Sequence, residues 1–324
     1  MKAMTKESLV KNLIQTLGII TFITIWTRVF GQQETLVAVA GITGLLMGLH
    51  LSLPTSFKEG ILASSVGFFV FGSIASLNII VATPLFFVVN LASIVALMFL
   101  FGTPFQYKHY MPYILVYIFA ATTPTEGFSL QTRLLSLGVM GFCLGIVYWM
   151  KHKKTKTTVP TLMDIAKWQP ELMKVSLTMG LGISIVLLVQ QQTHFPRAMW
   201  ICMTIMSLTQ MDRSVSKERF KKRLLGSAFG MIGYILLFEM LVPVEFQYIL
   251  VIVLTYIYSF AEDYLIQVVF ITLNVLYAAQ VTWPLGTAFV TRMGFILVGS
   301  ALMVSALWLA ERIVNRYRVP DKSM

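Results

Sequence analysis

Long apolar segments, separated by short polar ones, run through almost the whole chain and constrain its fold more than any other feature. A helix that crosses a bilayer needs about 20 mostly apolar residues. Segments that approach this length lie near residues 12–30, 35–53, 58–77, 79–101, 111–124, 130–150, 172–192, 196–211, 221–241, 246–261, 264–283 and 288–310. The sequence therefore predicts an all-α polytopic membrane protein with about 12 transmembrane helices, of which those at 111–124 and 196–211 are the shortest.

The composition excludes most soluble classes of protein. Hydrophobic residues make up 57% of the chain and charged residues only 12%, whereas soluble domains average about 45–50% and about 25%. Cys143 and Cys202 both lie in apolar segments, without the spacing of a disulfide framework or a metal site. Soluble enzymes, nucleic-acid binders and secreted disulfide scaffolds are therefore not expected.

The net charge of +11 is explained by the orientation of the chain in the membrane. With an even number of spans and a cytoplasmic N-terminus, all but four of the 25 Lys and Arg residues fall on the cytoplasmic side, as the positive-inside rule requires. The exceptions are Arg28, Arg133, Arg197 and Arg292. We therefore expect a multi-pass protein of the plasma or inner membrane with both termini cytoplasmic. No nucleic-acid partner is expected, whereas anionic lipid at the cytoplasmic face is an alternative reason for the basic clusters.

The two halves of the sequence match each other at a nearly constant offset. At a shift of 160, Tyr117 and Thr122 fall on Tyr277 and Thr282, and at a shift of 159, Arg133 falls on Arg292. Each half has six segments, so both would enter the membrane in the same sense, related by a pseudo-two-fold axis along its normal. We expect two parallel six-helix repeats at 1–150 and 172–324, joined by a basic cytoplasmic linker at 151–171.

Charged residues within membrane segments are candidates for function, because burying a charge there costs about 2.5–3.5 kcal/mol. Arg133 and Arg292 occupy matching positions near the expected outer ends of their spans. They could attract an anion, since a guanidinium binds carboxylates bidentately and keeps its charge, or they could extend to the outer headgroups. Proline breaks shortly before each Arg are either binding-site features or ordinary loops. The predicted substrate-binding residues are Arg133, Arg292, Thr122, Thr282, Tyr117 and Tyr277.

Other polar residues suggest a gate or a relay. Glu34 and Arg197 match at a shift of 163, so they could face each other as an external gate or lie in water. His50 and His109 could relay protons or lie at the interface. No metal-ligand cluster, nucleophile arrangement or phosphate-binding loop is visible, so neither an enzyme nor a cofactor is expected.

One further pattern lies in the second half of the chain. An aromatic-led span is followed by Gln210, a basic R-x3-R-x2-G-x3-G sequence opens the next span, and a late Arg292 precedes Gly299. This pattern resembles the fusaric acid resistance family, which includes bacterial aromatic acid exporters, and more distantly the plant aluminium-activated malate channels. The resemblance covers about 130 residues, while the first half, with Phe57-Lys-Glu-Gly60, lacks the arginines. The large cytosolic domain of many members has no counterpart among the expected elements, so no adaptor coupling is carried over.

The resemblance assigns Arg219, Arg223, Gly226 and Gly230 to the family pattern. The glycines would allow close helix packing, and the arginines would form a positive cytoplasmic mouth that attracts anions. We therefore expect a transporter that exports small organic anions, with aromatic carboxylates as substrates, along a path between the two repeats. A membrane scaffold or lipid-handling protein in cell-envelope construction, or an anion channel, is the alternative, and homo-oligomers are possible.

Overall fold

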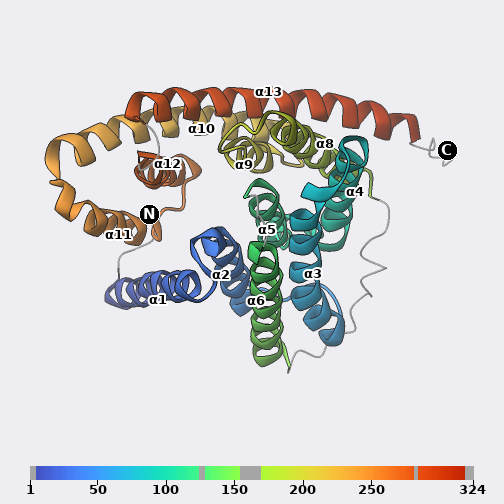
Figure 1. Cartoon of the computed structure of the whole chain (residues 1–324), viewed down its shortest axis with the longest axis horizontal. Coiled ribbons are helices and arrows are strands. Elements are labelled where there is room, and N and C mark those ends of the chain that lie inside the picture. Colours follow the sequence, from blue (N-terminus) through green and yellow to red (C-terminus); the bar gives the residue numbers. More distant parts are fainter. Residues whose placement is uncertain (1–4, 124–127, 154–168, 281–283, 318–324) are drawn as a thin grey trace. The chain divides into compact units, whose positions relative to one another are not determined.

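The computed structural model describes residues 5–123, 128–153, 169–280 and 284–317, and this part is helical without any β-strand (Figure 1). Each of the twelve expected apolar segments coincides with one α-helix of the described part. These helices are α1 (Lys6–Phe30), α2 (Thr35–His50), α3 (Phe57–Leu77), α4 (Thr83–Phe101), α5 (Met111–Thr122), α6 (Phe128–His152), α8 (Pro170–Thr193), α9 (Met199–Leu208), α10 (Arg213–Tyr234), α11 (Gln247–Tyr258), α12 (Tyr264–Gln280) and α13 (Leu285–Tyr317).

The helices differ in length more than the sequence suggests. Among the described residues, seven helices are long and apolar enough to cross a membrane, namely α1, α3, α4, α6, α8, α10 with its extension, and α13. By contrast, α5 has 12 residues and α9 has 10, which at 1.5 Å per residue gives about 18 Å and about 15 Å. These lengths are well below a hydrocarbon core of about 30 Å. A multi-pass membrane protein is thus indicated, but twelve complete crossings are not confirmed.

The helices group into two compact units. One unit, Phe22–Met211 with Leu302–Met324, contains α2 to α6, α8 and α9, and in it α5 is the central helix. Pro112 lies in the first turn of α5, where a missing N–H costs nothing, and every residue from Pro112 to Ala120 is buried. The neighbours of α5 include α2, α3, α4, α8 and α9. A helix too short to cross the bilayer is therefore surrounded by protein.

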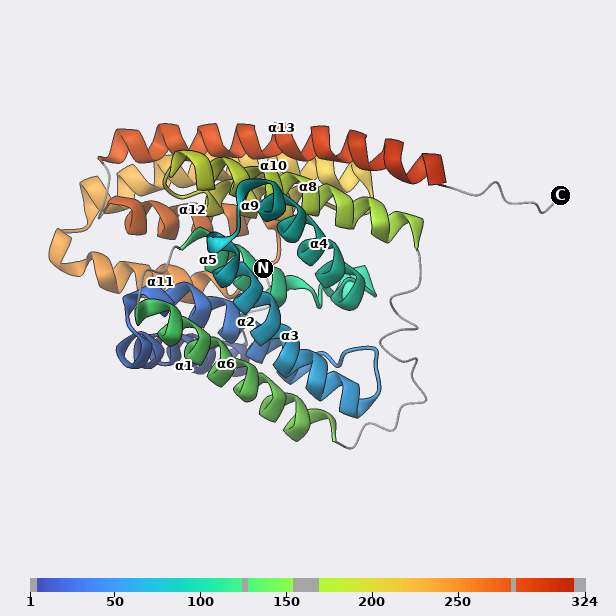
Figure 2. The same ribbon diagram turned by 45° about the vertical axis from the view of Figure 1, so that its right-hand side comes forward.

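Glycine and serine bring α3 and α6 of this unit into close contact. A Cβ added at Gly141 would lie 2.5 Å from the backbone oxygen of Ser65, and one added at Gly72 would lie 2.5 Å from the side chain of Leu137. Small residues allow such close approach of helices in membranes. Figure 2 shows α3 and α6 side by side, and α4 beside α8.

The other unit, Met1–Thr21 with Asp212–Ala301, is built around α10 and α12. The side chain of Asp212 accepts a hydrogen bond from the backbone N–H of Ser214 and caps α10, as Asp commonly does at a helix N-terminus. The helix continues as a π-helix over Ile235–Leu241. The units divide the chain differently from the predicted repeats, and residues 154–168 of the expected linker lie outside the described part, so the repeat boundaries stay a prediction.

Candidate functional site

Arg133 on α6 forms a buried ion pair. Its side chain is 0% exposed, and its Nε donates to Oε1 of Glu34 at 2.5 Å. Its Nη2 donates to the backbone oxygen of Gln33 at 3.2 Å. Beside the pair, the indole N–H of Trp26 donates to the hydroxyl of Ser136, one turn from Arg133. Arg133 is therefore held by protein groups and does not extend to lipid headgroups.

The pair leaves two polar atoms without a partner in the described part of the structure. These are Nη1 of Arg133 and Oε2 of Glu34, and both are buried. A charged pair gains enough attraction to offset its lost hydration only when its remaining donors and acceptors are satisfied. Burial of the Arg133–Glu34 pair therefore costs free energy of folding, because these two atoms lose their hydration without gaining hydrogen bonds.

Glu34 does not form the expected gate with Arg197. The carboxylate of Glu34 bonds to Arg133 instead, because η1 (Gln32–Glu34) turns its buried side chain toward α6. The guanidinium of Arg197 lies 5.0 Å from the ring centre of Trp200, in a cation–π arrangement. Arg197 also has a positive φ of 62°.

A second group of arginines gathers around Tyr264, at the start of α12. Nη1 of Arg223 donates to the hydroxyl of Tyr264 at 3.1 Å, and the guanidinium of Arg219 lies 5.0 Å from the centre of its ring. Arg292 on α13 is 3% exposed and lies within electrostatic reach of both Arg223 and Tyr264. Arg223 itself is 7% exposed. We call Arg219, Arg223 and Arg292 the arginine cluster.

The arginine cluster differs from the arrangement expected from the sequence. The sequence places Arg223 near the cytoplasmic side and Arg292 near the outer side, whereas in the structure the two charges are close enough to repel each other. The expectation from the sequence takes the depth of a residue in the membrane from its distance to the start of its helix, which holds only for helices parallel to the membrane normal. The 33 residues of α13 extend about 50 Å, so this helix is either tilted in a core of about 30 Å or extends beyond it. The depth of Arg292 therefore does not follow from its distance to the helix start.

The two glycines of the family pattern lie at the contact between α10 and α12. A Cβ added at Gly226 would lie 2.8 Å from the backbone oxygen of Leu265, and one at Gly230 would lie 2.9 Å from that of Val269. Both glycines are on the same buried face of α10 as Arg223. The close packing is observed, and a role in a gate or mouth stays a prediction.

We expect Gly226→Ala to destabilise the protein by about 1–3 kcal/mol, because backbone must move to accept the methyl group. Gly233→Ala on the same helix is the matched control, since its Cβ would lie 3.5 Å from Leu273 in ordinary contact. Thermal unfolding of the detergent-solubilised variants measures the difference. Equal unfolding temperatures for the two variants would contradict the close packing.

The remaining predicted site residues lie in different surroundings. The hydroxyl of Tyr117 donates to Oδ1 of Asn90 at 2.8 Å and joins α5 to α4. The backbone oxygen of Thr122 accepts a hydrogen bond from Gln190. Tyr277 packs on Phe238, with ring centres 5.4 Å apart. Thr282 lies outside the described residues.

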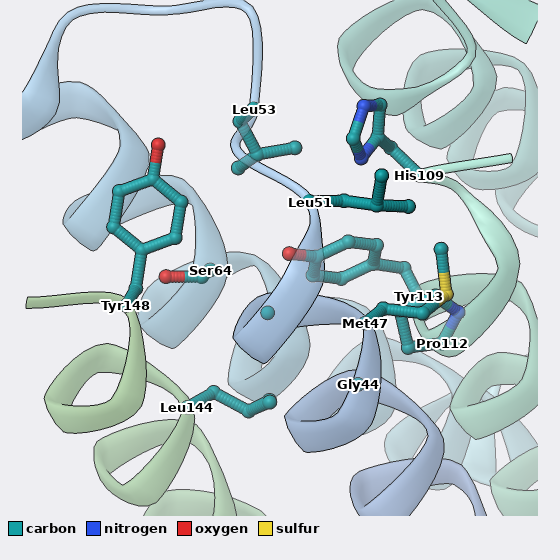
Figure 3. Close-up of a pocket in the computed structure, with 11 residues that line it drawn as sticks. Gly44, Met47, Leu51, Leu53, Ser64, His109, Pro112, Tyr113, Leu144 and Tyr148 are labelled. Carbon is teal, nitrogen blue, oxygen red and sulfur yellow. The ribbon is translucent and has the colours of Figure 1, made fainter. Parts of the chain in front are cut away.

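A small cavity of about 30 Å³ lies at the N-terminal end of α5 (Figure 3). The ring of Tyr113 lies in its middle, between Ser64 and Tyr148 on one side and His109 on the other. A cavity of this size holds one or two water molecules and is too small for an aromatic acid, because one water needs about 10–15 Å³. The cavity is therefore not a substrate site.

His109, which precedes α5, is 6% exposed, and burial lowers its pKa below the usual value. As the pH falls below about 6.5, the unfolded chain takes up a proton that buried His109 resists. We therefore expect buried His109 to lower the stability of the protein as the pH falls below about 6.5. The variant His109→Asn should reduce this dependence of stability on pH. His50→Asn is the control, since His50 is exposed and bonded to the backbone oxygen of Leu46. Unfolding temperatures on both sides of that pH measure the effect, and an unchanged dependence in His109→Asn would refute it.

The sequence-based predictions missed one polar run whose side chains form hydrogen bonds in the structure. The amides of Gln190, Gln191 and Gln192 donate to Thr122, Val81 and Thr83, in that order. Three successive glutamines at the end of an apolar segment were a usable signal, since amides at that position can bond neighbouring loops. Among the described residues, no three His, Cys, Asp or Glu side chains come together as a metal site.

Comparison with known proteins finds a match over part of the chain. Residues 181–306 match the family model described as fusaric acid resistance protein-like. The resemblance inferred from the sequence is thereby confirmed. The matched part contains the whole arginine cluster with Gly226 and Gly230. No curated protein and no solved structure matches the chain.

The family match and the apolar helices agree on the broad class. The match covers α9 to α12 with most of α8 and α13, and seven helices of the described part have the length and composition of membrane spans. Together these findings indicate a multi-pass membrane protein that contains a region similar to the fusaric acid resistance proteins.

Proposed function

We propose that the protein exports small organic anions, with aromatic carboxylates as substrates, and that the arginine cluster binds the carboxylate. The observation that supports this most directly is the approach of buried Arg223 and Arg292 to each other beside Tyr264. Two like charges in a poorly hydrated place repel, and an anion between them relieves the repulsion. The cluster therefore favours a negative ligand over a neutral or positive one.

The side chains also suit the shape of the substrate. A guanidinium presents a planar fork that matches a carboxylate, and it keeps its charge at any physiological pH. The hydroxyl of Tyr264 accepts a hydrogen bond from Arg223, and the guanidinium of Arg219 lies over the ring of Tyr264. This contact fixes two guanidinium groups before the anion arrives, which lowers the cost of ordering them on binding.

Export needs no dedicated coupling residue in this proposal. A unit negative charge that leaves the cytoplasm gains about 2.3 kcal/mol per 100 mV of membrane potential. We place the protein in the plasma or inner membrane with both termini cytoplasmic, so that anions enter from the cytoplasm. Anionic lipid and a second copy of the chain are proposed partners.

The proposal is tested by uptake of labelled benzoate into inverted membrane vesicles that contain the full chain. We expect saturable uptake with the natural sequence and at least about tenfold less with Arg223→Gln/Arg292→Gln, since a hydrogen bond to a charged group contributes about 1.5–3 kcal/mol. Lys217→Gln/Lys221→Gln removes the same charge from exposed positions of α10 and should leave uptake unchanged.

Two results would contradict the proposal. Equal uptake by the natural sequence and the Arg223→Gln/Arg292→Gln variant would show that the arginine cluster does not bind the anion. Absence of uptake of benzoate and of dicarboxylates in all proteins would favour the scaffold or lipid-handling function.

A further inference from the structure

The first helix, α1, is the least buried of the described helices that can cross a membrane. Only 11% of its apolar part is buried, whereas the other six such helices have 28–67% of theirs buried. The covered side of α1 carries Leu9 and Thr16, which are seven residues apart. The backbone oxygen of Leu9 accepts a hydrogen bond from the hydroxyl of Tyr256 on α11 at 3.1 Å, and Thr16 is 3% exposed. One side of α1 therefore packs within its own unit, and much of the rest is available to a partner.

Three residues with different properties share the uncovered side. Lys11 and Gly18 lie across α1 from Leu9 and Thr16, Gln15 lies next to them, and all three are exposed. Steps of four and then three residues keep them on one face at 3.6 residues per turn. The same spacing forms the seam between two helices that pack side by side. We call Lys11, Gln15 and Gly18 the open face of α1.

Gln15 is a polar residue in the apolar part of α1. Its side-chain amide makes no hydrogen bond within the described part of the structure. Hydrocarbon offers no water to replace the missing partners, so an unpaired amide is unfavourable there. Glutamine in a membrane helix commonly forms a hydrogen bond across to another helix. Gln15 therefore indicates a neighbouring helix on the open face.

The amide of Gln15 can be satisfied by the same residue of a second copy. It donates through its NH₂ group and accepts through its oxygen, so two such amides at the same depth complement each other. A two-fold axis along the membrane normal places two α1 helices parallel, with equal residues facing each other. Gly18 leaves room for this approach, since a Cβ there would meet nothing within 4 Å, and small residues allow helices to come close in membranes.

The charges at the cytoplasmic end of the open face also complement themselves. Glu7 and Lys11 are exposed on the same side of α1, and neither forms an ion pair with any described residue. In a parallel dimer, Glu7 of each copy lies within reach of Lys11 of the other copy. An anionic lipid headgroup would match Lys11 but would be repelled by Glu7. A second copy is therefore favoured over lipid as the occupant.

We propose that two copies of the chain form a parallel dimer through the open face of α1, with Gln15 paired across the two-fold axis and Glu7 paired with Lys11. The proposal assigns a defined surface to the second copy named above as a partner. It does not depend on the export of anions.

The first test measures association of the full chain in liposomes. Two populations of the protein carry a donor and an acceptor fluorophore, and energy transfer is recorded as the protein is diluted with lipid. We expect transfer that falls on dilution. Gln15→Leu should weaken dimerisation about threefold to tenfold, and Gly18→Leu at least about tenfold. Gly294→Leu on α13 is the matched control and should change nothing, since a Cβ at Gly294 also meets nothing within 4 Å.

An exchange of charge tests whether the partner is a second copy. Glu7→Lys and Lys11→Glu should each weaken dimerisation, because each variant puts like charges opposite each other. A mixture of the two variants should show more energy transfer between the two kinds of chain than within either kind. Lipid or a different protein as the occupant would give no such preference, and that result would overturn the proposal.

Disulfide formation tests the contact in native membranes. In a chain that also carries Cys143→Ala and Cys202→Ala, Gln15→Cys should cross-link two copies. Leu13→Cys should not, since Leu13 is also exposed and lies two residues away on a different side of α1. Equal cross-linking at the two positions would contradict the proposed face.

The remaining outcomes separate this proposal from the proposed function. Absence of energy transfer, or transfer that is unchanged in both Gln15→Leu and Gly18→Leu, would overturn the dimer through α1. Arg223→Gln/Arg292→Gln should dimerise as the natural sequence does even if it has lost uptake of benzoate. The dimer and the anion site can therefore fail separately.

Discussion

Glu34→Gln is expected to lower the free energy of unfolding by about 3–5 kcal/mol, because it leaves the guanidinium of Arg133 buried without its counter-ion. Arg133→Gln should have a similar effect, since it leaves the carboxylate of Glu34 uncompensated. The double variant Glu34→Gln/Arg133→Gln should be more stable than either single variant. The reason is that desolvation of an unpaired charge, and not loss of the attraction itself, dominates the cost of breaking a buried pair.

The measurement is thermal or denaturant unfolding of the four proteins in the same detergent. Glu171 and Lys174 provide the control, since they form a pair at 2.7 Å whose side chains are 55% and 20% exposed. Glu171→Gln should cost at most about 1 kcal/mol, as exposed pairs do. Additive losses in the double variant of Glu34 and Arg133 would show that the two residues act independently and that the pair is not formed.

Arg292→Met is expected to separate stability from transport. Removing the guanidinium relieves its desolvation and its repulsion with Arg223, which opposes the loss of its favourable contacts, so the unfolding temperature should change little. Uptake of benzoate into inverted vesicles should fall at least about tenfold, because one arm of the proposed carboxylate site is lost. Loss of uptake without loss of stability is the result expected of a residue that serves binding.

Arg312→Met is the control on the same helix, since Arg312 is exposed and its guanidinium lies 3.7 Å from the ring centre of Trp308. It should change uptake little. If Arg292→Met instead lowered the unfolding temperature and reduced uptake together, Arg292 would be a residue that stabilises the fold and not one that binds the anion.

The positions of the helices could be predicted because long apolar segments have few alternatives in a bilayer. The segment expected at 111–124 is the helix Met111–Thr122. The helix expected at 288–310 extends from Leu285 to Tyr317. Its charged last turns still bury Val314, at 1% exposed, so the buried face continues beyond the apolar segment.

The candidate site could be predicted only in part. Arg133 and Glu34 could each be selected as costly charges, but they are 99 residues apart and nothing local indicates that they pair. The glycines of α10 could be assigned to close packing, since the lack of a side chain allows close approach in any partner arrangement. The approach of Arg292 to Arg223 depends on helix tilt, which a hydropathy pattern does not specify.

The length of α13 makes lipid a determinant of the site. Even the apolar part expected from the sequence, 288–310, extends about 35 Å, which exceeds a core of about 30 Å. A helix in this situation tilts more in a thin bilayer and less in a thick one. Because Arg292 lies on α13, its depth and its approach to α10 vary with that tilt. For the carboxylate site that we propose, the affinity for anions is therefore expected to depend on the acyl-chain length of the surrounding lipid.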